Sequence, residues 1–349
     1  MVQDSVFRAK FKVVPDFKVW DGTYDYSFYK EGKSDLYIYT PEQFAAFCVK
    51  SSSIVGDNIV VHLMRSVIMY ADYEENFDWV DRYNSSSNKK PKNPLGETVS
   101  MTATINSGVT FDGHFHSIVG MYSVYGLTRN ENIRCFVIRQ NSTVKNLYLD
   151  HCSAYGTDCG ALFTQHREGS EQNPTIRSYL KNIQLRHCKV AGYTRYTGSL
   201  NWGILYAHAG YNYKYENLAD IYNCGLVDCY IDCYDSSGYA YYRENGIIKS
   251  GFGNYGGSGR QNGVTENCFA INTKSSGSAS CLYDIKPSSS FEQLSSNIYN
   301  YGDSEGYSLS SKTTKFTEIT SLYGAFNAYV ELSQDSELRK VDLETGMFV

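Results

Sequence analysis

The sequence predicts an all-β protein built as a parallel β-helix, a solenoid of stacked coils, with a short capping helix near the N-terminus. Three observations support this prediction. An Asn followed by alternating small or apolar residues recurs in four segments, and a second apolar tract trails each of them. The chain is also rich in Tyr, with 32 residues, and poor in Pro, with 6. Aromatic residues favour strands, and a recurring segment favours a stack of similar units.

The first tract of the repeat centres on an Asn that returns after 36, 41 and 44 residues. Because strand side chains alternate between two faces, the first and third positions after each Asn should point inward and form columns. Cys or Thr at the sixth position should form another column. We expect Asn itself to occupy a left-handed corner and to bond to the next Asn as a ladder. The ladder and columns are Asn146, Asn182, Asn223 and Asn267; Leu147, Ile183, Cys224 and Cys268; Leu149, Leu185, Leu226 and Ala270; and Cys152, Cys188, Cys229 and Thr273.

The second tract lies at variable distances from the first, at residues 160–163, 203–206, 246–249 and 280–283. Strands that persist while the spacing between them varies are typical of a solenoid, because insertions go outward into loops. We expect the four tracts to stack on one another in this alignment.

The ends of the stack need caps, because exposed sheet edges pair with other chains. Thr40, Pro41 and Gln43 form a capping box, which predicts a helix over residues 41–50 that covers the first coil. After about residue 300 the pattern gives way to Ser/Thr-rich strands and a polar tail. The predicted organisation is therefore an N-terminal segment with its capping helix at 1–50, a parallel β-helix with long loops at 51–300, and a C-terminal cap at 301–349.

The Asn tracts are similar to the GLUG-motif repeats of bacterial surface proteins. Two upstream elements resemble the same family, namely residues 20–45, which begin Trp-Asp-Gly-Thr, and residues 109–118, which contain Phe-Asp-Gly-His. The resemblance covers roughly residues 20 to 300, with few Gly-Gly pairs and more Tyr than the family pattern. It implies a pectin-lyase-like right-handed parallel β-helix, on or outside a bacterial cell and concerned with adhesion or glycans. It implies no catalytic residues.

Charge and hydropathy exclude some partners. The formal net charge is −5, and we interpret the nearest basic cluster, at residues 89–92, as a solvated loop, so no nucleic-acid partner is expected. No stretch reaches the roughly 20 apolar residues of a membrane span, so no membrane insertion is expected. The first fifteen residues lack a secretory signal. We expect an extracellular, cell-surface or virion location, with the signal removed or with release at lysis.

One group of polar residues could support catalysis. Coils stack about 4.8 Å apart, so His151, His187 and Asp228 should line one outer column, with Asp232 close by. Such a column could supply a general base and a cation, as in a polysaccharide lyase or glycosidase, and a lyase could use Ca²⁺. The polar outer face of a sheet gives the same pattern and is the favoured interpretation.

Metal ligation is not predicted from the sequence. His114 and His116 alternate on one strand face, but no third ligand is identifiable. Cys224, Cys229, Cys233 and Cys268 do not have zinc-knuckle spacing, and we interpret them as small apolar residues of the interior.

Aromatic residues cluster in the loops of two successive coils, where they could bind sugar rings or a protein partner. They could equally pack the loops against the wall. The predicted function is non-catalytic binding of glycans or a cell-surface partner. The alternatives are a lyase or glycoside hydrolase and a self-assembling structural protein, with a homo-oligomer as one form. The candidate binding residues are Tyr193, Tyr196, Trp202, Tyr206, Tyr211, Tyr213, Tyr239 and Tyr241.

Overall fold

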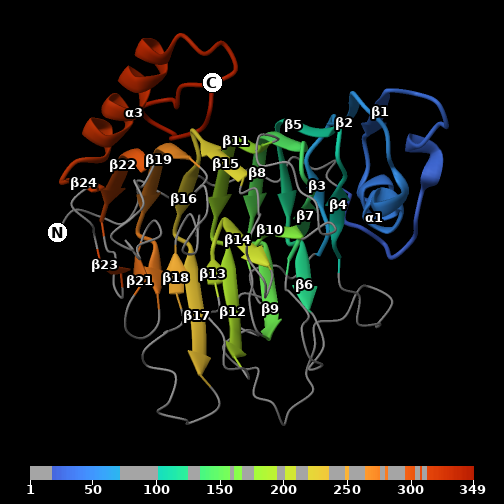
Figure 1. The fold of residues 1–349 in the computed structure, drawn as a ribbon, viewed down its shortest axis with the longest axis horizontal. Helices are drawn as coiled ribbons and strands as arrows, with labels where there is room; N and C mark the ends of the chain where they lie inside the picture. Colours follow the sequence, from blue (N-terminus) through green and yellow to red (C-terminus); the bar gives the residue numbers. More distant parts are fainter. Residues whose placement is uncertain are drawn as a thin grey trace.

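The protein is mostly β, in parallel sheets (Figure 1). Its structure is a computed structural model. It describes residues 18–70, 101–124, 134–157, 161–166, 177–194, 201–209, 219–235, 248–250, 264–275, 280–281, 295–302, 307–308 and 313–349.

The largest sheet, sheet A, runs the length of the molecule, and its strands lie side by side in chain order. Every pairing between them is parallel. Within the described residues its strands are β1 (Asp35–Ile38), β2 (Ile59–Leu63), β3 (Val67–Ile68), β5 (Val109–Val119), β8 (Thr143–Asp150), β11 (Ser178–Arg186), β15 (Ala219–Tyr222), β16 (Gly225–Val227), β19 (Thr265–Ile271), β22 (Ser295–Tyr301) and β24 (Thr313–Phe316).

Three smaller sheets follow the same rule, with parallel neighbours in chain order. Sheet B contains β4 (Ala103–Ile105), β7 (Phe136–Ile138), β10 (Phe163–His166) and β14 (Tyr206–Ala209). Sheet C contains β6 (Tyr122–Val124), β9 (Ser153–Thr157), β12 (Lys189–Thr194), β17 (Tyr230–Asp235) and β20 (Lys274–Ser275). Sheet D contains β13 (Asn201–Gly203), β18 (Ile248–Ser250), β21 (Ser280–Cys281) and β23 (Tyr307–Ser308).

The inward columns are confirmed, because every residue predicted for them is buried. Leu147 pairs with Ile183 across β8 and β11, and Cys268 pairs with Ile298 across β19 and β22. The cysteines of these columns are free and buried. Apolar side chains from successive repeats therefore fill one continuous core.

The Asn ladder is also confirmed. The four Asn residues have φ between 51° and 59°, and each side-chain amide donates to the oxygen of the preceding one, at 2.8 Å from Asn182 to Asn146 and 2.7 Å from Asn223 to Asn182. Asn267 donates to Asn223 at 2.7 Å, and Asn146 begins the ladder by donating to the Asp112 carboxylate at 3.0 Å. Asn is one of the few residues that adopts this backbone conformation readily.

The predicted alignment of the second tract is correct for one pair of repeats only. Phe163 lies opposite Tyr206, as expected, but Gly203 lies opposite Ser250 instead of residue 246, and Ser280 lies opposite Lys249. The cause is a corner inside the tract, because residues 201–203 belong to sheet D and residues 206–209 belong to sheet B. A Cβ on Gly203 would lie 2.0 Å from the Tyr206 carbonyl oxygen, so only glycine fits this turn.

The N-terminal helix prediction is confirmed by α1 (Pro41–Lys50), which follows the short 3₁₀ helix η1 (Tyr26–Phe28) and leads into η2 (Ser51–Ser53). Thr40 Oγ1 accepts a hydrogen bond from the Gln43 backbone N–H at 3.2 Å. Phe44 and Phe47 are buried, and their rings pack against Phe111 of β5. The helix therefore closes the core at the β1 end of sheet A.

The prediction of strands and a polar tail at the C-terminus was wrong in part. After β24 the chain forms α3 (Ile319–Ser333), on the side of sheet A opposite to sheet C (Figure 1). We call residues 319–349 the C-terminal cover. Leu322, Tyr323 and Phe326 are buried against outward-facing residues of sheet A. Their spacing is helical, but the Ser/Thr-rich composition around them obscured it.

Candidate functional site

The first candidate site, which we call the corner cluster, consists of Asp150, His151, His187 and Asp228. His151, His187 and Asp228 occupy equivalent left-handed corners with φ of 49°, 50° and 51°. Their backbone N–H groups donate to carbonyl groups of the next strand at 2.9, 3.0 and 2.9 Å. This shared backbone geometry stacks the two imidazoles, with ring centroids 4.5 Å apart and planes at 24°.

Asp150 links both imidazoles. Its Oδ1 lies 2.8 Å from His151 Nδ1 and 3.0 Å from His187 Nδ1. On the other side of the second ring, His187 Nε2 lies 3.8 Å from Asp228 Oδ2. The Asp150 side chain is 7% exposed and that of His187 is 40% exposed, so the cluster has a buried floor and an open side.

The charges of the cluster favour an ionised Asp150. Burial alone would raise the pKa of its carboxyl, but the contacts with His151 and His187 outweigh burial and lower that pKa to about 2. Burial lowers the pKa of His187, but the hydrogen bond with Asp150 and the charges of Asp150 and Asp228 together outweigh burial, so that pKa is raised. Asp150 is therefore a carboxylate that can accept hydrogen bonds or bind a cation, and it is a poor proton donor.

The predicted outer column is confirmed for His151, His187 and Asp228, which the structure brings together. Asp150, which binds both histidines, was not among the predicted catalytic residues. Its place directly before His151 at the end of β8 is the sequence signal for it. The backbone of Asp232 lies in β17 opposite Ala191, and its side chain lies outside the described residues.

The second candidate site, which we call the ring row, consists of Tyr37, His62 and His114 on the outer face of sheet A. Tyr37 and His62 stack with ring centroids 4.8 Å apart and planes at 12°, and His62 and His114 follow at 5.1 Å and 24°. His62 Nδ1 lies 2.8 Å from His114 Nε2, and its Nε2 lies 3.1 Å from the Asp35 carboxylate. Burial, with a contribution from His114, lowers the pKa of His116 on the same strand.

The ring row is solvent-accessible at its outer end. Tyr37 is 42% exposed and Tyr39, whose ring centroid lies 6.5 Å from that of Tyr37, is 48% exposed. Sequence analysis singled out His114 but missed Tyr37 and His62, because β1 and β2 precede the Asn repeat and share no motif with it. Only strand pairing, which places Tyr37 opposite His62, brings them together.

The prediction that Tyr206 is one of the aromatic binding residues was wrong. Its side chain is fully buried in the core, where its hydroxyl accepts a hydrogen bond from the Ala219 N–H at 3.4 Å. It lies on the inward side of β14, directly after the corner, so its ring packs inside instead of in a loop. The backbones of Tyr193 and Trp202 lie in β12 and β13. Their side chains lie outside the described residues, as do Tyr196, Tyr211, Tyr213, Tyr239 and Tyr241.

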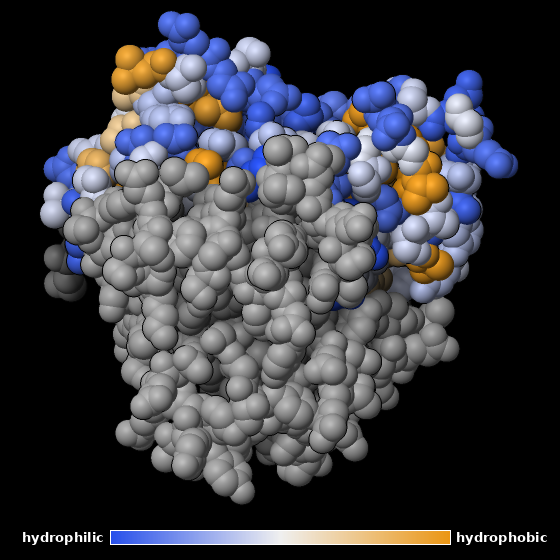
Figure 2. Space-filling view, in the orientation of Figure 1, coloured by the Kyte–Doolittle hydropathy of each residue, from blue (hydrophilic) through white to orange (hydrophobic). Residues whose placement is uncertain are grey.

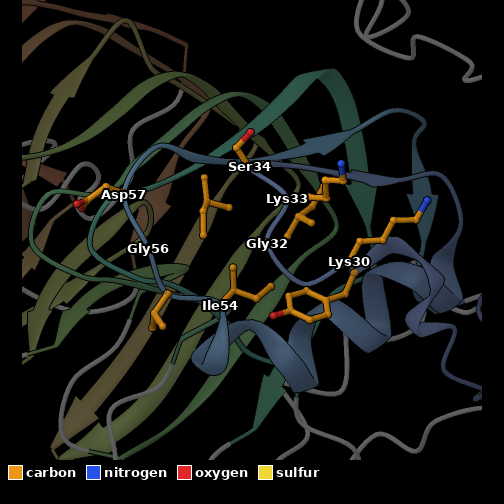
Figure 3. A pocket seen from close by; sticks show the side chains of 11 residues that line it. Lys30, Gly32, Lys33, Ser34, Ile54, Gly56 and Asp57 are labelled. Carbon is orange, nitrogen blue, oxygen red and sulfur yellow. The ribbon is translucent and has the colours of Figure 1, made fainter.

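A small cavity of about 260 Å³ lies near the N-terminal end, lined by residues of the turn before β1 and the segment after η2. The ammonium groups of Lys30 and Lys33 point away from it, and Ile54 forms part of an apolar wall (Figure 3). No described charged side chain is directed into the cavity in that view. The corner cluster and the ring row are therefore stronger candidates.

Comparison with known proteins assigns no family. No family model matches the chain, and neither the curated proteins nor the solved structures contain a match. None of the helices in the described residues has the length and apolarity needed to cross a membrane. Function must be inferred from the two sites.

Proposed function

We propose that the chain is a right-handed parallel β-helix related to GLUG-motif repeat proteins. Two observations support this: the described strands of all four sheets are parallel to their neighbours, and each sheet follows chain order. Connections between parallel strands of one sheet are almost always right-handed, which favours that hand here. The Asn ladder and the buried Cys column also support it, because equivalent residues of successive repeats lie beside one another, as in a stack of coils.

We propose further that the protein is a non-catalytic recognition protein that binds glycans, at a cell surface or on a virion. The ring row is the observation that carries this proposal. The free face of Tyr37 and the neighbouring Tyr39 offer aromatic surface to a sugar ring, and Asp35 offers a carboxylate to its hydroxyl groups. A few polar groups beside aromatic rings fix the orientation of such ligands.

The surroundings of the row support a polar ligand. Figure 2 shows hydrophilic residues between two raised parts of the upper surface, one at the C-terminal cover and the other at the α1 end of sheet A. Among the described residues, the exposed aromatic rings stand in pairs, Tyr24 with Tyr26 and Tyr37 with Tyr39, and do not form a broad apolar patch of the kind that marks protein interfaces. The net charge of −5 opposes binding to polyanions such as nucleic acids.

The proposal is tested by incubating the full chain with a panel of neutral and acidic polysaccharides and measuring both binding and reaction products. We expect binding without reducing ends or unsaturated products. Tyr37→Ala should weaken binding by about tenfold, which corresponds to about 1.4 kcal/mol of lost stacking. Tyr26→Ala, which removes an equally exposed ring outside the row, should leave affinity unchanged.

Two results would contradict the proposal. If the Tyr37→Ala variant bound glycan as tightly as the unchanged protein, the ring row would not be the glycan-binding site. Concentration-dependent self-association with no binding to any glycan would instead favour a structural, self-assembling protein. The Tyr-rich loops remain a second proposed contact region, tested in the same assay by Tyr196→Ala and Tyr213→Ala.

The corner cluster favours one alternative, a polysaccharide lyase or glycoside hydrolase. Asp150 is ionised beside two imidazoles, and Asp228 approaches His187 from the other side, so a base and several polar groups meet at a partly open site. Product formation that His187→Gln and Asp228→Asn both abolish, with binding retained, would establish this alternative over simple recognition.

A further inference from the structure

The geometry of the corner cluster points to a metal site: we propose that Asp150, His151 and His187 together bind one divalent first-row transition ion, such as Zn²⁺. Their ligand atoms lie within 4.8 Å of one another. Among the described residues, no other group of three or more His, Cys, Asp or Glu side chains has its ligand atoms this close together. This proposal is independent of glycan binding at the ring row.

The distances are close to those of a coordinated ion. A tetrahedral Zn²⁺ with bonds of about 2.0–2.1 Å separates its ligand atoms by about 3.4 Å. The two Nδ1 atoms now lie 2.8 and 3.0 Å from Asp150 Oδ1. An outward movement of each ligand atom by a few tenths of an ångström would admit the ion, and small side-chain rotations supply that movement.

The donor set selects the class of ion. Two imidazole nitrogens and one carboxylate oxygen suit Zn²⁺ and its neighbours in the first transition row. Ca²⁺ and Mg²⁺ take oxygen ligands, so a lyase-type Ca²⁺ site is disfavoured at this position. The thiols of the Cys column do not compete, because Cys152, Cys188 and Cys229 are buried in the core.

The site is preorganised by the fold. Asp150 is the last residue of β8, and each histidine is held at a corner by a backbone hydrogen bond to the next strand. Asp228 lies 3.8 Å from His187 Nε2, on the ring edge away from Asp150. That distance is too long for a hydrogen bond, so Asp228 acts on the ring through its charge. An ion can enter from the open side, where the His187 side chain is 40% exposed.

A bound ion would tie two successive repeats together, since Asp150 and His151 belong to one and His187 to the next. Binding to the folded state alone raises stability by mass action. We therefore expect both a binding isotherm and a higher melting temperature when the metal is added.

The test uses the full chain without an affinity tag, treated with a chelator and dialysed, then titrated with ZnCl₂ in a calorimeter and melted with and without the metal. We expect one strong site. His151→Gln and His187→Gln should each weaken Zn²⁺ binding by about tenfold or more, and Asp228→Asn should weaken it less. Co²⁺ should bind with visible absorption bands that both histidine variants lose.

His62→Gln is the matched control, because it removes an imidazole with close His and Asp neighbours at the ring row. It should leave Zn²⁺ affinity unchanged. Circular dichroism of each variant identifies any that fails to fold. His187, whose side chain is 40% exposed, supplies a variant that should fold. The proposal is overturned if the folded protein binds no Zn²⁺, if His187→Gln binds it as tightly as before, or if His62→Gln removes the site.

Discussion

The outer face of sheet A has two regions that differ in one respect, whether the chain returns to cover them. Over β8 to β22 the C-terminal cover lies on the sheet, whereas the ring row on β1, β2 and β5 lies outside this covered region. Tyr148 on β8 is 2% exposed, and Tyr37 on β1 is 42% exposed. An outward-facing tyrosine of sheet A is therefore buried in one region and exposed to solvent in the other.

The covered region also shows how the cover supplies hydrogen-bond partners to most of a buried polar ladder, although Asn267 Oδ1 at its end has no partner among the described residues. Asn182 and Asn223 donate to the backbone carbonyl groups of Glu337 and Arg339, each at 2.7 Å. Gln184 is fully buried and donates to the Gly346 carbonyl at 3.0 Å. The cover thus supplies acceptors that water would otherwise provide, as buried amides require.

The largest expected effect breaks the covered region. Phe326 of α3 is fully buried and contacts Phe269 at a ring-centroid distance of 5.1 Å. Phe326→Ala should lower the free energy of unfolding by about 4 kcal/mol, because it leaves a cavity between helix and sheet. Leu332→Ala, on the same helix but 82% exposed, should change it by less than about 0.5 kcal/mol. Urea unfolding followed by circular dichroism measures both; equal effects would show that the cover does not pack as described.

A second change interrupts the ladder beneath the cover. Asn182→Ala removes donors to Asn146 and Glu337 and places alanine at a φ of 52°. We expect a loss of about 3 kcal/mol from unpaired buried groups and backbone strain together. Asn182→Gly relieves the strain but not the lost hydrogen bonds, so its loss should be smaller. If the glycine variant were as unstable as the alanine variant, backbone strain would not contribute to the loss of unfolding free energy.

A matched pair of hydroxyl deletions compares the two regions directly. The Phe348 N–H donates to the Tyr148 hydroxyl at 2.6 Å, in a buried setting. Tyr148→Phe should cost about 1.5 kcal/mol, because that N–H loses its partner. Tyr37→Phe should leave thermal stability almost unchanged, since water serves the exposed hydroxyl. If the melting curves of the two variants coincided, the Tyr148 hydroxyl would not be buried beneath the cover as described.

The smallest expected effect is a pH dependence of the cover. The hydrogen bond from Lys181, opposed by burial and aided by Lys145, lowers the pKa of Glu337. A folded-state pKa below the unfolded value stabilises the protein above the unfolded pKa, and this contribution is lost as the pH falls through the folded value. Because Glu337 is 48% exposed, we expect only about 0.5 kcal/mol. Unfolding free energies of the unchanged protein and of Glu337→Gln should differ at pH 7 and converge near pH 3; a constant difference would refute the assignment.

Sequence analysis predicted the parts of the fold that repeat. Leu147 and Ile183 occupy equivalent places in successive segments, so their inward direction follows from local alternation, and the corners follow from Asn. The cover escaped prediction because its contacts join residues far apart, such as Asn182 and Glu337, and nothing local marks such partners. The ring row was missed for the same reason, since strand pairing alone places Tyr37 beside His62. Of the corner cluster, the column was predicted and the shared role of Asp150 was not.

The run of side-chain amides from Asn267 to Asp112 has a direction, because every carboxamide donates toward the start of the chain and the final acceptor is an anion. The amide dipoles therefore add along the axis instead of cancelling, and the negative carboxylate stands where their donor ends point. Each internal step is chemically the same, so excision of residues 147–182 would bring the next Asn against the one that precedes the cut and restore the pattern. The ladder itself therefore tolerates the loss of a whole unit, at the cost of the contact between Asn182 and the cover, whereas the acidic terminus of the run is not interchangeable with its other end.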